Sequence, residues 1–206
     1  MHEISITNIL RRKWDTIALF VGLSLVLTLI LTLVQPFKYS GSTRILIIQK
    51  AVTSGDQFNA LRAVERISDN LALVVHTTSF FEKVMAAGAD QINLSVFSPL
   101  ESKKRQQWAK MVTATSIRGT GLLTIEVFHK DRGQALAIAQ AVANVLAAHG
   151  WEYVGTGDIQ VKIVDTPIAS RWPTKPNVLA NLLTGLILGL VLGGTYVFSG
   201  MRAVMK

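Results

Sequence analysis

Two long apolar blocks dominate the pattern of hydrophobic and polar positions along the chain. They cover residues 16–34 and 178–198, and neither block contains a charged residue. As α-helices rising 1.5 Å per residue, they would be about 28 Å and about 31 Å long, close to the thickness of the hydrocarbon core of a bilayer. Because lipid offers no hydrogen-bond partners to the backbone, each block is predicted to be a transmembrane helix.

The first block also has basic residues in front of it, as a secretory signal peptide does. Its apolar run is longer than the core of a signal peptide, however. Gln35, Pro36 and Phe37 follow it, where a cleavage site would need small residues. We therefore interpret the block as an uncleaved membrane anchor.

The basic residues nearest the two blocks predict the orientation in the membrane. Arg11, Arg12 and Lys13 precede the first block, and Arg202 and Lys206 follow the second. Because cytoplasmic flanks carry the excess of Lys and Arg, both ends of the chain are expected in the cytoplasm. The chain is thus expected to cross the plasma (inner) membrane twice. The expected organisation is a cytoplasmic N-terminus (1–15), a first transmembrane helix (16–34), a periplasmic or extracellular domain (35–177), a second transmembrane helix (178–198) and a cytoplasmic tail (199–206).

The central segment alternates between strand-like and helix-like patterns. Strands are predicted where β-branched residues gather or apolar and polar residues alternate, at 39–48, 92–96, 111–118, 123–128 and 159–164. Helices are predicted from apolar residues at helical spacing and from capping residues, at 60–74, 80–87, 99–110 and 131–149. This order predicts an α/β domain with helices packed on a mixed sheet, so the whole chain is expected to be an α+β membrane protein.

The clearest local signals lie in the second half of this domain. Gly119, Thr120 and Gly121 form a turn between two predicted strands. Asp131 then starts a helix with Gln134 three residues later, in the manner of a capping box. The buried stripe of this helix is predicted to consist of Ala135, Ile138, Ala139, Val142, Val145 and Leu146.

Composition and motifs narrow the chemistry that the domain can perform. The chain has no cysteine, which excludes disulfides, thiol nucleophiles and thiolate metal sites. Its histidines, at positions 2, 76, 129 and 149, lack metal-ligand spacing, and no nucleotide-binding or serine-hydrolase motif occurs. We therefore expect no metal, no cofactor and no enzymatic activity. The formal net charge of +8 is no sign of nucleic-acid binding, because the domain is expected outside the cell.

Glycines in the second apolar block predict a helix contact. Gly185, Gly189 and Gly193 recur every four residues and so lie on one face, where another helix can approach closely. That helix is either the first helix of the same chain or a helix of a neighbouring subunit.

A basic cluster and a proline-rich segment are further candidates. Lys103, Lys104, Arg105 and Lys110 form the densest basic cluster, interpreted either as a solvated helix face or as a contact for a glycan or lipid. The prolines before the second block predict a stiff extended connection between the domain and the membrane, because proline fixes φ and restricts the preceding residue. They are Pro167, Pro173 and Pro176.

The order of these features resembles the Wzz-type chain-length determinants, also called polysaccharide co-polymerases. The first helix is left through Pro36 and Tyr39 into a strand, and a later strand leads through Asp131 to an Ala-rich helix containing Ala143-Asn144. The chain returns to the membrane through an Asp and spaced prolines, followed by a glycine-patterned helix. The membrane-proximal residues that carry the resemblance are Pro36, Tyr39, Asp165, Pro167, Pro173 and Pro176.

The resemblance implies a non-enzymatic role in the biosynthesis of a surface polysaccharide, such as lipopolysaccharide O-antigen, capsule or exopolysaccharide. Family members act as oligomers in the membrane and regulate chain length or assist polymerisation and export. The implied partners are further copies of the chain, membrane lipid, the polysaccharide polymerase or export machinery, and the growing glycan.

Two departures from the family pattern indicate a minimal member. The chain has no room for the long helical insertion of larger members. It also lacks a fused kinase domain and a tyrosine after residue 198, so a cytoplasmic kinase partner is expected only if the N-terminal residues contact a separate kinase.

Two other classes of function remain open from the residues alone. One is an outer ligand-binding sensor or adaptor that signals through a separate partner. The other is an enzyme acting on lipid-linked sugars, for which Glu126, Asp131 and Asp165 would be the candidate carboxylates.

Overall fold

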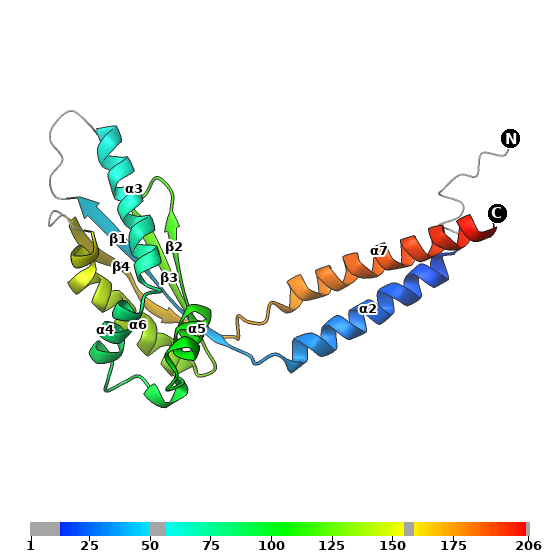
Figure 1. Cartoon of the computed structure of the whole chain (residues 1–206), viewed down its shortest axis with the longest axis horizontal. Helices are drawn as coiled ribbons and strands as arrows, with labels where there is room; N and C mark the ends of the chain where they lie inside the picture. The colour runs from blue at the N-terminus through cyan, green and yellow to red at the C-terminus, as the bar shows by residue number, and fades with distance from the viewer. Residues whose placement is uncertain (1–12, 50–56, 155–158, 205–206) are drawn as a thin grey trace. The chain divides into compact units, whose positions relative to one another are not determined.

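The computed structural model describes residues 13–49, 57–154 and 159–204, which divide into two compact units. One unit contains two long helices, α2 (Trp14–Val34) and α7 (Val178–Val204). Both helices are long and apolar enough to cross a membrane, α2 over its whole length and α7 over Val178–Ser199. The other unit, Phe37–Thr174, is an α+β domain (Figure 1).

Within the described residues, the domain is built on a four-stranded sheet with the order β2-β3-β1-β4. The strands are β1 (Tyr39–Gln49), β2 (Val112–Ile117), β3 (Leu122–His129) and β4 (Ile159–Ala169). Every neighbouring pair is antiparallel, so the expectation of a mixed sheet is wrong. The physical reason is that β3 and β4 do run in the same direction, but β1 lies between them. The crossover from β3 to β4 therefore creates no parallel pair.

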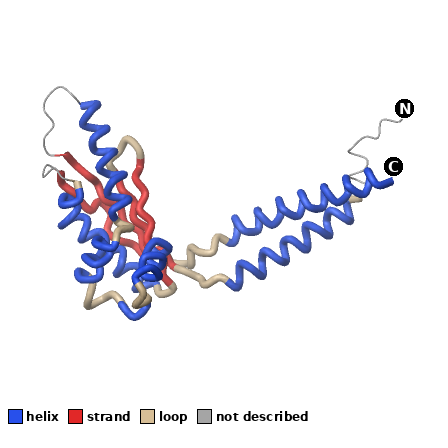
Figure 2. Tube along the Cα trace, viewed as in Figure 1, coloured by secondary structure: helices blue, strands red, loops and turns tan. Residues whose placement is uncertain are grey.

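Helices cover one face of this sheet. They are α3 (Gln57–Val74), α4 (Thr78–Ala87), α5 (Glu101–Met111) and α6 (Arg132–His149). Helix α6 contacts β1, β3 and β4, and α4 packs on α6 (Figure 2). Two short 3₁₀ helices, η1 (Leu94–Val96) and η2 (Gly150–Tyr153), complete the described part of the domain.

Residues 92–96, predicted to be a strand, are instead a turn around η1. The Asn93 side-chain oxygen accepts hydrogen bonds from the backbone N–H and the hydroxyl of Ser95, which closes the turn. Such local side-chain bonds give the backbone an alternative to a sheet ladder. The alternation of apolar residues predicted a strand here, but the Asn93 side chain stabilises a turn instead.

The hydrophobic core lies between the helices and the covered face of the sheet. Alternate residues of the two central strands point into it, among them Ile45, Ile47, Leu123, Ile125 and Val127. All the residues of the predicted α6 stripe are buried, which confirms that part of the prediction. The largest fully buried side chain is Trp108 of α5, whose indole N–H donates to the Val75 carbonyl oxygen at 2.7 Å.

Asp131 is the N-cap of α6, as predicted, and its carboxylate accepts from the Gln134 backbone N–H at 3.0 Å. The reciprocal bond of a capping box is absent among the described contacts, because the Asp131 N–H donates to His129 Nδ1 instead. The Gln134 side chain reaches the preceding loop, where its amide donates to the Gln91 carbonyl and its oxygen accepts from the Asn93 N–H. A capping residue therefore also fixes the loop between α4 and α5.

The first turn of α6 lies directly against β1 at Gly41. An added Cβ at this position would lie 2.3 Å from the Ala135 carbonyl oxygen and 2.7 Å from its carbonyl carbon. Real Cβ atoms do not approach backbone atoms so closely. Glycine at this position is thus what allows the helix to rest on the central strand.

We predict that Gly41→Ala destabilises the domain by about 1–3 kcal/mol, because the methyl group overpacks the contact between β1 and α6. This would lower the unfolding midpoint of the full chain in detergent by roughly 4–12 °C, followed by near-UV circular dichroism. Ser40→Ala, on the neighbouring residue, is the control and should leave the midpoint nearly unchanged. Equal midpoints for Gly41→Ala and wild type would show that the helix can move away at little cost.

Candidate functional site

The three glycines of the predicted stripe face α2 of the same chain. An added Cβ at Gly185 would lie 2.3 Å from Thr28 Oγ1, and one at Gly189 would lie 2.6 Å from the Val21 Cα. At Gly193 it would lie 3.1 Å from the Ile17 Cα. Of the two partners left open by the sequence, this contact is with the first helix. Small residues permit such close backbone approach between membrane helices.

Polar side chains join the two helices along the same contact. The Ser24 hydroxyl donates to the Gly185 carbonyl oxygen at 2.7 Å, and the Asn181 amide donates to Thr32 Oγ1 at 3.0 Å. Thr28 and Thr32 also donate to carbonyls of their own helix, one turn earlier. Hydrogen bonds between apolar helices hold the pair in one register, because a shifted pair would leave these groups unpaired.

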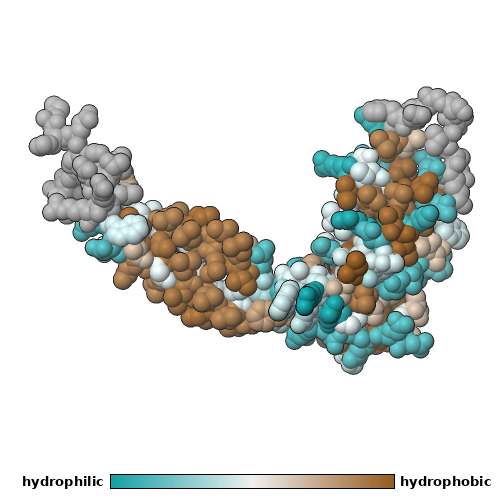
Figure 3. All heavy atoms as spheres, turned by 180° about the vertical axis from the view of Figure 1, so that it is seen from behind, coloured by the Kyte–Doolittle hydropathy of each residue, from teal (hydrophilic) through white to brown (hydrophobic). Residues whose placement is uncertain are grey.

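The sequence carried a signal for this contact that the glycine pattern alone does not contain. Ser24, Thr28 and Thr32 are spaced four residues apart in α2, so they form a stripe of hydroxyl side chains on one face. That stripe meets the glycine stripe of α7. The face of both helices seen in Figure 3 is largely apolar, and the exposed side chains of the pair include Leu19, Leu23, Leu183 and Leu190.

The prolines of the predicted connection occupy two different settings. Pro167 lies inside β4, which continues to Ala169 and not only to residue 164 as predicted. Since β4 is an edge strand, a proline that cannot donate to a ladder is tolerated there. Pro36 and Pro173 are exposed, Pro176 is half-buried, and these three lie outside the strands.

The segments that lead out of β1 and β4 toward the long helices are hydrogen-bonded to each other. The Ser170 N–H donates to the Ser40 carbonyl at 2.7 Å, and the Ser40 N–H donates to the Ser170 hydroxyl at 2.9 Å. Further out, the Thr174 N–H donates to the Lys38 carbonyl at 2.8 Å. Tyr39, the first residue of β1, is half-buried and pairs with His129 of β3. The two exits of the domain therefore lie side by side.

The structure splits the predicted basic cluster. Lys104 forms an ion pair with Glu101 one turn earlier on α5, and its ammonium lies 5.7 Å from the centre of the Phe81 ring. Lys103 and Lys110 are exposed and, being seven residues apart, lie on one side of the helix. Arg105 lines a small hollow beside His76 and Trp108. The hydrogen bond from Lys104 lowers the pKa of Glu101.

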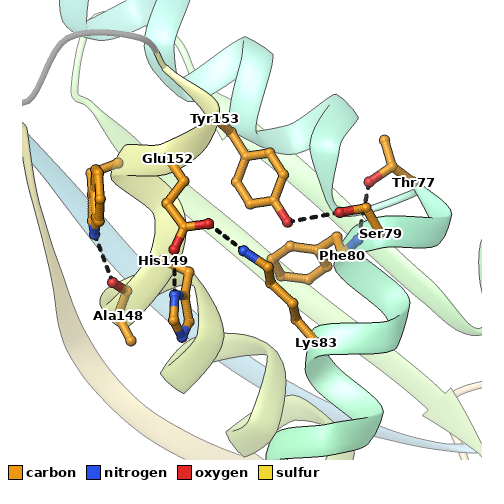
Figure 4. A network of polar contacts seen from close by, with 9 residues as sticks. Thr77, Ser79, Phe80, Lys83, Ala148, His149, Glu152 and Tyr153 are labelled. Atoms are coloured by element: carbon orange, nitrogen blue, oxygen red, sulfur yellow. Dashed lines mark hydrogen bonds and ion pairs between the residues drawn. The ribbon is translucent and has the colours of Figure 1, made fainter.

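A polar network that no sequence motif indicated clamps α4 to the end of α6 (Figure 4). Lys83 of α4 forms an ion pair with Glu152 of η2, whose other carboxylate oxygen lies 2.6 Å from His149 Nδ1. The Tyr153 hydroxyl lies 3.4 Å from the Ser79 hydroxyl, and its ring lies against buried Phe80 with centroids 6.2 Å apart. Lys83 and Ser79 are far from Glu152 and Tyr153 in the sequence, so no local spacing could have predicted the contacts between α4 and η2.

The ion pair shifts the pKa of both members. The hydrogen bond from Lys83, and then that from His149, lowers the pKa of Glu152, while the bond to Glu152 raises the pKa of Lys83. The lowered carboxylate pKa means that the pair stabilises the fold above about pH 4, the unfolded value, and less as the pH falls through the folded pKa. The raised lysine pKa means that this stability is lost only as the pH rises through the folded pKa of Lys83.

The candidate carboxylates of an enzyme do not all come together. Glu126 and Asp165 line one hollow on the uncovered face of the sheet, with Arg44 between the two strands that carry them. Asp131 caps α6 elsewhere, and the bonds from the Gln134 and Gly133 N–H groups lower its pKa. Within residues 13–49, 57–154 and 159–204, no group of three or more potential metal ligands occurs. Position 2, the first of the histidines, lies outside the described residues.

Comparison with known proteins adds no relative. No model of a known protein family matches the chain, and no curated protein matches it.

We predict that Gly189→Leu separates the two long helices, because its side chain would enter the space held by the Val21 backbone. The cysteine-free chain permits a direct measurement. Thr32→Cys and Asn181→Cys, introduced together, should form an intrachain disulfide rapidly in oxidised membranes. Adding Gly189→Leu should slow this reaction at least fivefold.

The matched control for the helix contact is Gly194→Leu, because an added Cβ at Gly194 meets nothing within 4 Å. It should leave the cross-linking rate unchanged. If both leucine variants slow the reaction equally, added bulk in α7 and not the contact at Gly189 is responsible.

We further predict that Glu152→Gln lowers the unfolding midpoint of the chain at pH 7, and that this difference from wild type shrinks toward pH 3. In acid the wild-type carboxylate becomes protonated and resembles the amide. Midpoints measured by near-UV circular dichroism at several pH values check this. Glu82→Gln, at an exposed position of α4, should show no such convergence. A deficit of Glu152→Gln that persists unchanged at pH 3 would contradict the role of the ion pair.

Proposed function

We propose that this chain is a two-pass protein of the plasma (inner) membrane that acts as a homo-oligomer in surface polysaccharide biosynthesis. In this proposal it performs no catalysis and regulates the length of the polysaccharide or assists its polymerisation and export. Both termini lie in the cytoplasm and the α+β domain lies outside, as a Wzz-type chain-length determinant would be arranged.

The observation that carries the proposal is the adjacency of the first and last strands of the domain. Strand β1 begins soon after α2, and β4 ends shortly before α7. The two strands are antiparallel neighbours, with Gly41 opposite Ala169, so both connections leave from the same end of the sheet. A domain with its two exits side by side is suited to insertion between two membrane helices that also lie side by side.

The helix pair gives the proposal further support. The polar side chains of Ser24 and Asn181 are hydrogen-bonded within the helix pair, while the outward surface of the pair is largely apolar. Such a surface suits lipid and close packing against further copies of the chain or against a polymerase in the membrane. Arg11, Arg12 and Lys13 lie immediately before the first block. These basic residues support a cytoplasmic N-terminus, because Lys and Arg next to a membrane helix mark its cytoplasmic end.

The resemblance to chain-length determinants is the reason for proposing surface polysaccharide biosynthesis as the pathway. The motifs that carry it are the exit through Pro36 and Tyr39 and the return through Asp165 and Pro167. In this proposal the growing glycan meets the outer domain, and the helices contact the polymerase or export machinery.

We predict that loss of the gene changes the length distribution of the surface polysaccharide on a gel, by a shift in modal length or by loss of long chains. Wild-type protein supplied in trans should restore the distribution, and Gly194→Leu should do so as well. Gly189→Leu should restore it poorly at equal protein level, because the helix pair is disturbed. An unchanged ladder after gene loss would refute the proposed function, and ligand binding by the outer domain would become the leading hypothesis.

A further inference from the structure

Among the described residues of the domain, the helices pack on one face of the sheet and leave the other without a helix. Side chains alternate along each strand, so burial of Thr43 and Ile45 on one face leaves Ser42, Arg44 and Leu46 of β1 on the other. The same holds for β3, where Thr124 and Glu126 point away from the buried residues. This uncovered face is a continuous surface four strands wide, with a composition that can be read directly from the register.

The register arranges polar side chains in two rows across the sheet. In the first row the paired residues, from β2 to β4, are Thr113, Glu126, Ser42 and Ile168. In the second they are Thr115, Thr124, Arg44 and Asp165. Since neighbouring strands lie about 4.8 Å apart, the two rows form a polar strip about 14 Å long. The next row consists of Ile117, Leu122, Leu46 and Lys162, so it is apolar on β2, β3 and β1 and carries an exposed cation on β4.

A shallow hollow lies in this strip, at the contact of β1 with β4. Its polar lining comes from three strands and consists of Ser42, Thr43, Arg44, Thr124, Glu126, Asp165 and Thr166, with Ile168 as the apolar member. Arg44 Nη1 lies 3.4 Å from Asp165 Oδ2, and both side chains are about half exposed. The Glu126 side chain is exposed.

Irregular pairing between β1 and β4 shapes this hollow. The register shifts between Ser42 and Arg44 and again between Arg44 and Ile45, so β4 contains extra residues on both sides of Asp165. The Thr43 hydroxyl fixes the distortion by donating to the Asp165 carbonyl oxygen at 2.7 Å. Bulges of this kind re-aim side chains at binding sites. Here the distortion brings Asp165 and Thr166 together beside Arg44.

The lining offers every kind of hydrogen-bonding group to a ligand in solvent. Glu126 and Asp165 accept, Arg44 donates, and the hydroxyls of Ser42, Thr124 and Thr166 can do both. A sugar also presents hydroxyls that donate and accept at once, so it can be satisfied by such a mixture. A protein partner fits less well, because the centres of protein interfaces are depleted of charged residues and enriched in aromatic ones.

The charges of the hollow bear on which glycan it suits. Two carboxylates and one guanidinium line the hollow itself, and the ammonium of Lys162 lies in the row beyond it. The two carboxylates disfavour a polyanion such as nucleic acid or a polyuronate at the centre of the hollow. Neutral sugars and amino sugars meet no such repulsion. We propose that the strip between β3 and β4, centred on Arg44, Glu126 and Asp165, is a binding site for a glycan of neutral or amino sugars. This assignment rests on the proposed function, for which it supplies the contact with the growing polysaccharide.

The test uses the full chain in lipid nanodiscs and oligosaccharides released by mild acid hydrolysis from the surface polysaccharide of the same cells. Saturation-transfer NMR and calorimetry should detect binding to wild type. Glu126→Ala and Arg44→Gln should each weaken it tenfold or more with unchanged unfolding midpoints. Gln160→Ala, on the same face but outside the hollow, should bind within twofold of wild type.

Galacturonate oligomers of the same length should bind more weakly than neutral or amino-sugar oligomers. Tighter binding of the galacturonate oligomers would overturn the charge argument, and absence of any saccharide binding to wild type would overturn the site.

Complementation in cells separates failure of the site from failure of the function. If gene loss changes the polysaccharide ladder but Glu126→Ala and Arg44→Gln restore it fully, the site is refuted and the proposed function stands. If gene loss leaves the ladder unchanged while purified protein still binds the oligosaccharides with loss in both variants, the function is refuted and the site stands.

Discussion

The pairing of β1 with β4 is the constraint on which the rest of the domain depends. It places the first and last strands of the domain next to each other, so that the segments leading to both long helices leave together. All other elements of the domain lie between these two strands along the chain. The helices cover one face of the sheet, and the β2–β3 hairpin extends the sheet beside β1. The position of Gly41 within this pair matters further, because α6 rests on β1 at that residue and the core is assembled beneath it.

The same arrangement explains why chemistry is concentrated on the uncovered face and not in a closed cavity. Helices occupy the apolar face and form the hydrophobic core with it. The opposite face carries hydroxyls, the Arg44–Asp165 ion pair and Glu126, bordered by the exposed apolar residues Ile117 and Ile168. A polar sheet face has two possible uses, either solvent contact or recognition of a polar ligand. The bulges around Asp165 distinguish this strip from an ordinary solvated sheet, since they cost ladder hydrogen bonds.

Local patterns in the sequence predicted those parts of the fold that depend on neighbours along the chain. The hairpin after Met111, the Asp131 cap and the buried stripe of α6 follow from strand alternation, capping and helical period, and the structure confirms them.

The prediction of a mixed sheet was wrong because strand order depends on which strand lies between β3 and β4. The spacing of residues along the sequence carries no information about that order. The extent of β4 was underestimated because Pro167 reads as a break, although an edge position removes the penalty. The glycine stripe predicted a helix contact correctly in kind, but its partner became identifiable only beside the hydroxyl stripe at Ser24, Thr28 and Thr32. The Lys83–Glu152 pair and the hollow at Arg44 both join distant segments, so only the folded chain brings them together.

The hydrogen bonds between the two exit segments, at Ser40 and Ser170, have a mechanical consequence. Any force that draws the two long helices apart is delivered through these segments to the open end of the β1–β4 ladder, at right angles to the strands. Loaded in this direction, the hydrogen bonds fail one after another from that end, beginning with Thr174 to Lys38 and then Ser170 to Ser40. A pull along the strands would instead load the whole ladder at once. Such a joint yields to small forces by peeling, and the polar strip around Arg44 and Asp165 lies within the next few pairs to open. The shape of the hollow therefore depends on the outer end of the β1–β4 ladder staying paired.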